Sequence, residues 1–189
     1  MENYKKILTV IDPTTDDQKA LKRSIELARR TGGEITAFLT IYDFSYEMTT
    51  MLSGEEREAM RQSMINDRMQ WLEEKIAEVD HHSITINTSI IWHNRPFEKI
   101  IQKVITEDFD IVIKGTHQHD TFKSVIFTPT DWHILRKCPC PVLLVKEHNW
   151  PDNGNLLTAL NIGSDDEEHK ALNEKLTQEA THLSSLIKA

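Results

Sequence analysis

The sequence lacks any long apolar run and any disulfide framework. No segment of the 189 residues approaches the ~20 consecutive apolar residues that a membrane-spanning helix needs. The first ten residues, MENYKKILTV, do not have the layout of a signal peptide. Only two cysteines occur, separated by a single residue, so no set of structural disulfides is expected. These absences predict a cytoplasmic protein that does not associate with membranes.

An excess of positive charge is also missing. The chain has 22 Lys and Arg against 30 Asp and Glu, a net charge of −8, and no basic cluster is visible along it. Direct binding of nucleic acid needs a clustered basic face, so we expect none. Hydrophobic residues at 39% and charged residues at 28% fit a soluble globular protein of one ordinary domain plus a remainder.

Common signatures of catalysis on α/β folds are absent as well. The sequence has neither a G-x-S-x-G nucleophile elbow nor a GxxxxGK[ST] phosphate loop. HIGH-like and SGGxDS-like motifs are also missing. Asp12 and His117 could serve as base and acid if a shared rim of strand ends brought them together, but nothing else in the sequence joins them. We therefore expect a protein that is not an enzyme.

What the sequence does contain is an alternation of short apolar runs with amphipathic stretches. Each apolar run has the length of a buried strand, and each amphipathic stretch repeats its apolar residues near the helical period. This alternation predicts an α/β domain with a three-layer open parallel five-stranded sheet, right-handed crossovers and helices on both faces. The expected strands cover residues 5–11, 35–42, 84–92, 109–114 and 142–146.

Helix starts are indicated by capping residues. Asp16 or Asp17 is placed to cap the first helix. The stretch Ser53-Gly54-Glu55-Glu56 has the spacing of a capping box for a second, long helix. Pro96 stands at the first position of a third helix and Pro129 at that of a short fourth helix, where the missing N–H of proline does no harm.

The stretch from Asp110 to Val145 carries the strongest functional signal. An apolar strand runs into a single glycine, Gly115, and a polar loop then leads to the helix that opens at Thr128 and Pro129. In an open α/β sheet, a loop at the carboxyl end of a strand together with a helix N-terminus is the usual seat for a phosphate or another anion. The pattern predicts a ligand cleft at the strand ends.

The C-terminal part of the sequence resembles its own beginning. LLTALNIGSDDEEHKALNEKLTQEATHL repeats ILTVIDPTTDDQKALKRSIELARRT with two extra residues in the loop, and Asn161 takes the place of Asp12. Such self-similarity indicates a duplicated domain. We expect a domain over residues 1–148, a linker over residues 149–155 and the first strand and helix of an incomplete second domain over residues 156–189. The last part should be poorly ordered or packed against another chain, because its apolar face has no domain of its own.

Motifs spread over residues 1–148 carry a resemblance to a known family. The first strand ends in Asp12 within ILTVID, the loop that starts at Gly115 keeps the first glycine of a G-x-x-G-x9-G-S/T pattern, and the last strand is entered through Pro139-Cys140-Pro141-Val142. In this combination the chain resembles the universal stress proteins, tandem members included. The resemblance implies an adenine-nucleotide alpha-hydrolase-like fold. In nucleotide-binding members it implies ATP held by the first-strand Asp, by backbone near the position of Tyr42 and by the glycine loop on the phosphates.

Only part of that loop is carried over into this chain. Gly115 matches the first glycine, whereas Gln118 and Thr128 stand at the second and third glycine positions. Gln118 has a side chain where the backbone must approach a phosphate closely. Pro129, at the following Ser/Thr position, lacks an N–H donor, and Asp131 in the first helical turn would repel an anion. We predict that ATP or AMP binds weakly or not at all in the manner of the family, and no certain cofactor is expected.

The candidate ligand-contacting residues come from the strand ends and the loop. They are Asp12, Tyr42, Arg95, Gly115, His117, Gln118, Thr128 and Thr130. Arg95 is a candidate anion contact because a guanidinium group holds phosphate or carboxylate through two parallel hydrogen bonds. A solvated arginine in a turn is an equally good interpretation of the same residue.

Two further groups of residues have both a functional and a structural interpretation. His117 and His119, with His133 nearby, suggest zinc, but no ligand pair with helical spacing accompanies them, so ligand-lining or surface histidines are favoured and no metal is expected. Cys138-Pro139-Cys140 does not have the C-x-x-C spacing of a redox motif, and we expect these cysteines to serve structural packing.

The resemblance also implies a function. It implies a role in stress resistance, including survival of DNA damage, and in motility or adhesion. We expect the strand-end cleft to bind a small-molecule ligand of unknown identity, and the protein to act as a homodimer or a tandem pseudo-dimer. Two alternatives stay open: an ATP-binding signalling module with slow or no hydrolysis, and a ligand-free scaffold that acts through dimer or tandem-domain contacts.

Overall fold

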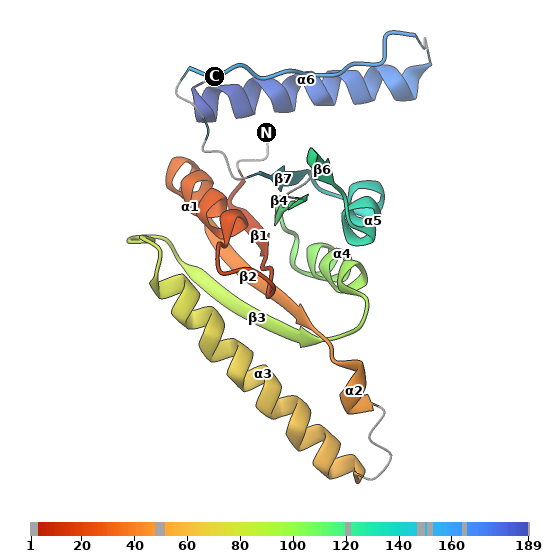
Figure 1. The fold of residues 1–189 in the computed structure, drawn as a ribbon. Helices are drawn as coiled ribbons and strands as arrows, with labels where there is room; N and C mark the ends of the chain where they lie inside the picture. Colours follow the sequence, from red (N-terminus) through yellow and green to blue (C-terminus); the bar gives the residue numbers. More distant parts are fainter. Residues whose placement is uncertain are drawn as a thin grey trace. The chain divides into compact units, whose positions relative to one another are not determined.

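The chain divides into two units, residues 1–147 and residues 148–189 (Figure 1). Within the described part of the chain, no helix is both long and apolar enough to cross a bilayer. The computed structural model describes residues 4–47, 52–119, 122–146, 150, 153–163 and 166–188.

The first unit is built on a single parallel sheet of five strands in the order β3-β2-β1-β4-β7. All neighbouring strands in it run parallel, which confirms the predicted α/β class and the five-stranded parallel sheet. Each strand begins and ends within two residues of its expected position. The strands are β1 (Lys6–Val10), β2 (Glu34–Ile41), β3 (Ile86–Trp92), β4 (Ile111–Gly115) and β7 (Val142–Val145).

Helices cover both faces of this sheet. On β1, Thr9 Oγ1 donates a hydrogen bond to Ser24 Oγ of α1 at 2.6 Å, whereas the neighbouring Leu8 packs with Ile100 of α4. Successive side chains of a strand point to opposite faces, so α1 lies on one face and α4 on the other, with α5 beside α4. The helices of this unit are α1 (Lys19–Thr31), α2 (Phe44–Glu47), α3 (Gly54–Ala77), α4 (Pro96–Glu107) and α5 (Pro129–Lys137).

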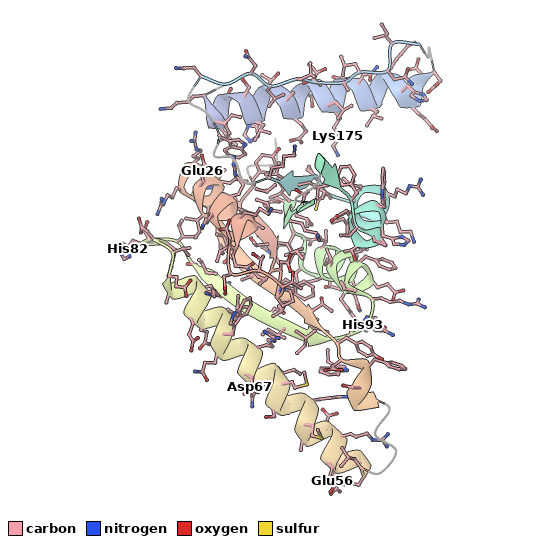
Figure 2. The ribbon with its side chains drawn as sticks, viewed as in Figure 1. Glu26, Glu56, Asp67, His82, His93 and Lys175 are labelled. Carbon is pink, nitrogen blue, oxygen red and sulfur yellow. The ribbon has the colours of Figure 1, made fainter. Side chains whose placement is uncertain are left out.

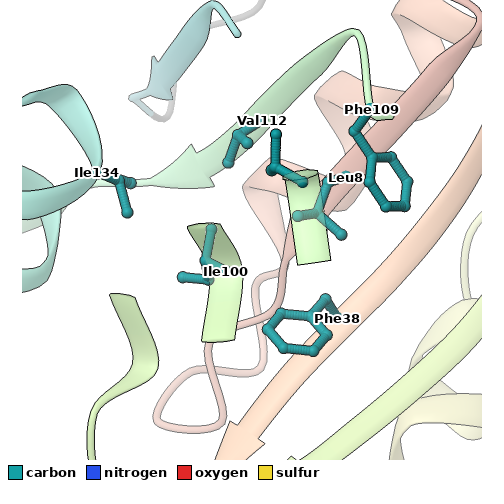
Figure 3. Packing of buried hydrophobic residues seen from close by; sticks show 7 residues of the cluster. Leu8, Phe38, Ile100, Phe109, Val112 and Ile134 are labelled. Carbon is teal, nitrogen blue, oxygen red and sulfur yellow. The ribbon is translucent and has the colours of Figure 1, made fainter. Parts of the chain in front are cut away.

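The hydrophobic core between the sheet and the α4–α5 layer joins strands and helices that are far apart in sequence (Figure 3). Leu8, Phe38 and Val112 come from three adjacent strands, and Ile134 comes from α5; all four are fully buried. Strands buried on both faces read as continuous apolar runs, which is why short runs located them in the sequence. The cluster consists of Leu8, Phe38, Ile100, Val104, Phe109, Val112 and Ile134.

The long helix α3 begins with the predicted capping box. Ser53 Oγ accepts a hydrogen bond from the backbone N–H of Glu56 at 3.2 Å, and the Glu56 carboxylate accepts one from the backbone N–H of Ser53 at 2.7 Å. Hydrogen bonds to the Glu56 carboxylate from the backbone N–H and then the side chain of Ser53 lower the pKa of Glu56. The helix packs against β3 with Leu72 and Ile76 buried.

The start of α1 differs from the prediction. Neither Asp16 nor Asp17 caps the helix; the N-cap is Gln18, whose side chain makes no capping hydrogen bond. Gln18 instead binds the preceding loop, because its buried amide donates to the carbonyl oxygens of Asp12 and Thr15, each at 2.7 Å, and accepts from the Asp12 N–H at 3.2 Å. The prediction was wrong because α1 begins after the two aspartates, at Lys19, and the preceding Gln18 binds the loop.

The polar loop expected after β4 is a β-hairpin. Strand β5 (His117–His119) pairs antiparallel with β6 (Phe122–Ile126) in a separate two-stranded sheet. The sequence predicted a polar loop here and no strand. The segment FKSVI of β6 has two adjacent polar residues followed by two adjacent apolar residues, so it lacks the strict alternation that marks a half-buried strand.

The second unit contains an extended segment and the helix α6 (Glu167–Ile187). Residues 156–160, where a strand was expected, form no paired strand within the described residues; a strand requires a neighbour for its backbone hydrogen bonds. No described residue of α6 is buried. Leu157 is 96% exposed and Leu172 is 51% exposed, so the expected apolar face is open to solvent.

The loops that open the two units nevertheless share a local structure. Asp12 Oδ1 accepts the N–H of Thr14 at 2.9 Å, and Asn161 Oδ1 accepts the N–H of Gly163 at 3.1 Å. Both are side-chain to backbone turns between residues i and i+2. The aligned residues of the repeat therefore fold the chain in the same way at the same point.

A carboxylate at the amino-terminal edge of the sheet connects β1 to β4. Asp110 Oδ2 accepts the backbone N–H groups of Lys5 at 2.7 Å and of Lys6 at 2.8 Å, and the Asp110 N–H donates to the Lys6 carbonyl at 2.9 Å. These hydrogen bonds align the beginnings of β1 and β4, which are about a hundred residues apart in the sequence.

We predict that Asp110→Ala lowers the free energy of unfolding by about 1–3 kcal/mol, because two backbone donors lose a charged acceptor. Urea unfolding followed by circular dichroism measures this. Asp67→Ala on the exposed side of α3 (Figure 2) is the matched control, with an expected change within about 0.5 kcal/mol. Equal effects of the two substitutions would contradict the role assigned to Asp110.

Candidate functional site

A cavity of about 270 Å³ lies at the carboxyl ends of the strands. Residues of β1, β2 and β4 form its floor, and the first residues of α4 and α5 form its walls. This is the location predicted for a ligand cleft in an open α/β sheet. Its lining consists of Val10, Ile11, Asp12, Pro13, Thr40, Pro96, Lys114, Gly115, Thr128 and Thr130.

Asp12 is held in place by its own loop. Its carboxylate Oδ1 accepts hydrogen bonds from the N–H and the hydroxyl of Thr14, at 2.9 and 2.6 Å, while the buried amide of Gln18 binds its backbone on both sides. A side chain fixed in this way offers its remaining acceptor capacity in a defined direction. Asp12 can therefore accept a hydrogen bond from a ligand with little loss of side-chain freedom.

Gly115 ends β4 at a point of close approach, although its partner there is a side chain. A Cβ atom at Gly115 would lie 3.3 Å from both Cγ and Cε of Lys19, whose stem crosses the glycine. Its backbone does not adopt the left-handed conformation that favours glycine, since the only described glycine with that conformation is Gly32. The glycine therefore provides room for the lysine stem at the rim of the cavity.

The N-terminus of α5 is closed by a capping box that the sequence analysis did not identify. Asp131 Oδ2 accepts the backbone N–H of Thr128 at 2.7 Å and its hydroxyl at 2.9 Å, and Thr128 Oγ1 lies 3.2 Å from the Asp131 N–H that donates to it. The carboxylate of Asp131 thus occupies the positive end of the helix from within the protein.

Lys114 completes this arrangement with a buried ion pair. Its Nζ lies 2.8 Å from Asp131 Oδ1, with the lysine side chain 12% exposed and the aspartate side chain fully buried. Lys114 Nζ also donates to the Gly115 carbonyl at 3.2 Å. Lys114 was not predicted from the sequence, although a single lysine between the apolar run of β4 and the glycine was a signal that could have identified it.

This geometry determines what the cavity can hold. Two groups here could donate to a phosphate, the ammonium of Lys114 and the capping N–H of Thr128. Both already bind the carboxylate of Asp131. Pro129 contributes no N–H to the same helical turn. An incoming phosphate would have to displace a buried, paired carboxylate or lie beside its negative charge, and both cost free energy.

The structure brings together four of the eight predicted site residues. Asp12, Gly115, Thr128 and Thr130 line the one cavity. Tyr42 is not in that lining; its ring packs on Trp92 with the centroids 5.8 Å apart. Strand β2 ends at Ile41, so Tyr42 directly follows the strand, whereas the sequence predicted it as the last residue of that strand.

Arg95 also lies outside the described lining of the cavity. Its Nη1 forms an exposed ion pair with Glu98 at 2.9 Å, while Pro96 of the same turn does line the cavity. Gln118 and His117 belong to the backbone of β5, and their side chains lie outside the described residues. The described residues contain no group of three or more metal-binding side chains.

Comparison with known proteins gives consistent matches. A model of the universal stress protein family matches residues 3–146. Universal stress protein E of Escherichia coli K12 is 52% identical over 187 residues, which is 99% of this chain and 59% of that protein. The chain therefore spans a little over half the length of this relative.

Solved structures share the fold. A Pseudomonas aeruginosa PAO1 protein of unknown function matches all of this chain and 59% of its own, with 26% identity and a TM-score of 0.69. A universal stress protein crystallised in complex with cAMP matches 75% of this chain and 96% of its own, with 10% identity and a TM-score of 0.51. The second likeness concerns the fold alone.

We predict that Lys114→Met destabilises the protein by about 3 kcal/mol, because it leaves the buried carboxylate of Asp131 without its charged partner. The free energy of urea unfolding provides the measurement. Lys22→Met removes a lysine from an exposed ion pair with Asp17 at 2.6 Å and should change it by less than about 1 kcal/mol. The assignment fails if both variants lose the same stability.

Gly115→Ala should leave the free energy of unfolding within about 1 kcal/mol of the original, since the flexible Lys19 stem can shift by a few tenths of an ångström. Gly33→Ala serves as the contrasting variant, because its Cβ would lie 2.7 Å from the backbone oxygens of Tyr4 and Lys5. Overpacking against backbone should cost about 1–3 kcal/mol. Thermal unfolding of both variants checks this order.

Proposed function

We propose that this chain, which belongs to the universal stress protein family, has its role in the stress response as a binding protein that acts without catalysis. Its strand-end cavity binds a small ligand, and it does not bind ATP in the manner of nucleotide-binding members. The role includes resistance to stress such as DNA damage and effects on motility or adhesion, in the cytoplasm and without direct contact to nucleic acid. This extends what the sequence resemblance implies.

The ion pair between Lys114 and Asp131 is the observation that carries this proposal. It pairs the ammonium of Lys114 with a carboxylate that also occupies the helix cap, so these two groups offer the cavity no unpaired charged donor. The other polar side chains of the lining are the carboxylate of Asp12 and the hydroxyls of Thr40 and Thr130, since the hydroxyl of Thr128 belongs to the helix cap. Such a set suits a neutral or cationic ligand with hydrogen-bond donors better than a triphosphate.

The size of the cavity supports a small ligand. Its volume of about 270 Å³ lies close to the lower end of the ~300–1,000 Å³ range of pockets that bind small molecules. Among the described residues that line it, no base, acid and nucleophile come together: Asp12 holds Thr14, and Lys114 is paired with Asp131. Binding without reaction is therefore the activity that these residues support.

A nucleotide-binding signalling module is the second candidate function. The observation that favours it is the fold shared with the universal stress protein that was crystallised in complex with cAMP. A cyclic monophosphate carries a single negative charge and would meet less repulsion from Asp131 than ATP would. Arg95 would then be a rim contact, provided that it leaves Glu98.

The repeat supports a tandem arrangement. Residues 156–189 match the opening of the first domain, including the turn at Asn161, and their apolar side chains lie open to solvent. We propose that they begin a second domain of the same type, so that the two domains form a tandem pseudo-dimer. A homodimer of the first domain is the alternative, and a ligand-free scaffold would act through either contact.

Isothermal titration calorimetry tests the ligand proposal. We expect Mg-ATP to bind with a dissociation constant weaker than about 1 mM. Asp131→Asn keeps a capping side chain, frees Lys114 and should strengthen ATP binding at least about tenfold, which corresponds to ~1.4 kcal/mol. Asp67→Asn, which removes an exposed carboxylate of α3 outside the cavity, should leave the affinity unchanged.

Micromolar binding of Mg-ATP by the original protein would overturn the proposal in favour of the nucleotide module. The ligand itself is sought by mass spectrometry of small molecules released when the purified protein is denatured. A released neutral or cationic compound whose binding is lost in Asp12→Ala supports the proposal. A cavity from which no compound is released, and which binds no compound from a metabolite library, supports the scaffold.

A further inference from the structure

The two cysteines lie in contact at the end of the sheet opposite to the cavity. Cys138 is the residue that ends α5 and Cys140 precedes the start of β7, and their Sγ atoms are 3.6 Å apart. Neither cysteine is in a disulfide and both are half-buried, and they pack against the core cluster around Ile134 and Val112. The expected packing role is present, but the side chains also converge on one another.

The backbone on both sides of this pair is fixed. The Cys138 N–H donates to the Ile134 carbonyl at 2.9 Å, and the Pro141 carbonyl accepts the Val112 N–H at 3.0 Å. The intervening Pro139 has a restricted φ. Because neither end of the turn can move freely, the two sulfur atoms are held within reach of each other at little further cost in conformational entropy.

The surroundings of Cys138 favour its thiolate. Hydrogen bonds from the side chain and then the backbone of Cys140 lower the pKa of Cys138 to about 7, against burial, which raises it. Arg136 and Lys137 in the last turn of α5 place positive charge near a helix end that would otherwise disfavour an anion. The thiolate is the reactive form of cysteine in oxidation and disulfide exchange.

We propose that Cys138 and Cys140 are a peroxide-reactive dithiol that closes reversibly to a disulfide within one chain, a modification site separate from the ligand cavity. A structural zinc site is not an alternative here, because it needs four ligands and no group of three or more metal-binding residues occurs in the described part of the chain. The proposal rests on the contact between the thiols, whatever the cavity binds.

The chemistry balances with a hydroperoxide, ROOH, as the oxidant. The Cys138 thiolate attacks the terminal peroxide oxygen, the O–O bond breaks, and the leaving RO⁻ takes a proton from solvent to give ROH and a sulfenic acid on Cys138. The sulfur of Cys140 then attacks the sulfenic sulfur, the S–O bond breaks, and the hydroxide leaves with the Cys140 proton as water. Two thiols are oxidised and one peroxide is reduced; an external dithiol reverses the change.

Intact-protein mass spectrometry of the full chain after brief exposure to hydrogen peroxide tests the proposal. We expect the mass to fall by two hydrogen atoms, both thiols to resist N-ethylmaleimide, and dithiothreitol to restore both changes. In Cys140→Ser, which lacks the second thiol, dimedone should trap a sulfenic acid on Cys138. In Cys138→Ser, the remaining thiol should react with peroxide several-fold more slowly than the dithiol of the original chain.

Three results would overturn the proposal. In the first, both thiols still react with N-ethylmaleimide after peroxide has oxidised free glutathione in the same tube. In the second, Cys138 becomes a sulfinic acid while Cys140 is unchanged. In the third, non-reducing gels show a disulfide that joins two chains. Circular dichroism checks that each serine variant folds. If one does not fold, the mass and alkylation of the original chain decide the question alone.

Discussion

A buried charge must have a partner, and the candidate site of this protein depends on that constraint. The carboxylate of Asp131 has no exposure to solvent and is stabilised by the ammonium of Lys114 and by the capping groups of Thr128. Because each of these groups comes from the end of β4 or the start of α5, the pair fixes the distance between strand and helix. The same interaction lies beside the cavity and occupies two candidate anion-binding groups, the ammonium of Lys114 and the cap of α5.

The fold was predictable because its strands are buried on both faces. A strand such as β2 is buried along most of its length and is therefore mostly apolar, so Glu34–Ile41 is visible in the sequence without any knowledge of its neighbours. Local chemistry was equally visible where the partners are close in sequence, as in the capping box of Ser53. It was misjudged at Gln18, because the sequence does not reveal that its amide binds a loop rather than the helix that it precedes.

The site was predictable only in part, for a related reason. Asp12, Gly115 and Thr128 lie at strand ends and a helix start, and parallel strands bring such positions to one edge. Lys114 was not predicted because its importance comes from a carboxylate 17 residues later (131 − 114), and the distance between them is a property of the folded chain. The contact between Cys138 and Cys140 likewise depends on a turn that is fixed at both ends by other strands and helices.

The hydrogen bonds of Asp110 affect the order in which the strands of the sheet can pair during folding. The middle strand β1 can pair with β2 soon after β2 is synthesised. Its other neighbour, β4, and the Asp110 carboxylate that aligns the two strands come about a hundred residues later in the chain. A chain emerging from the ribosome therefore holds β1 with one edge unpaired until β4 is available. Long-range pairing of this kind slows folding and leaves a sheet edge open to other chains. The centre of the finished sheet is thus among the last parts to be enclosed during synthesis.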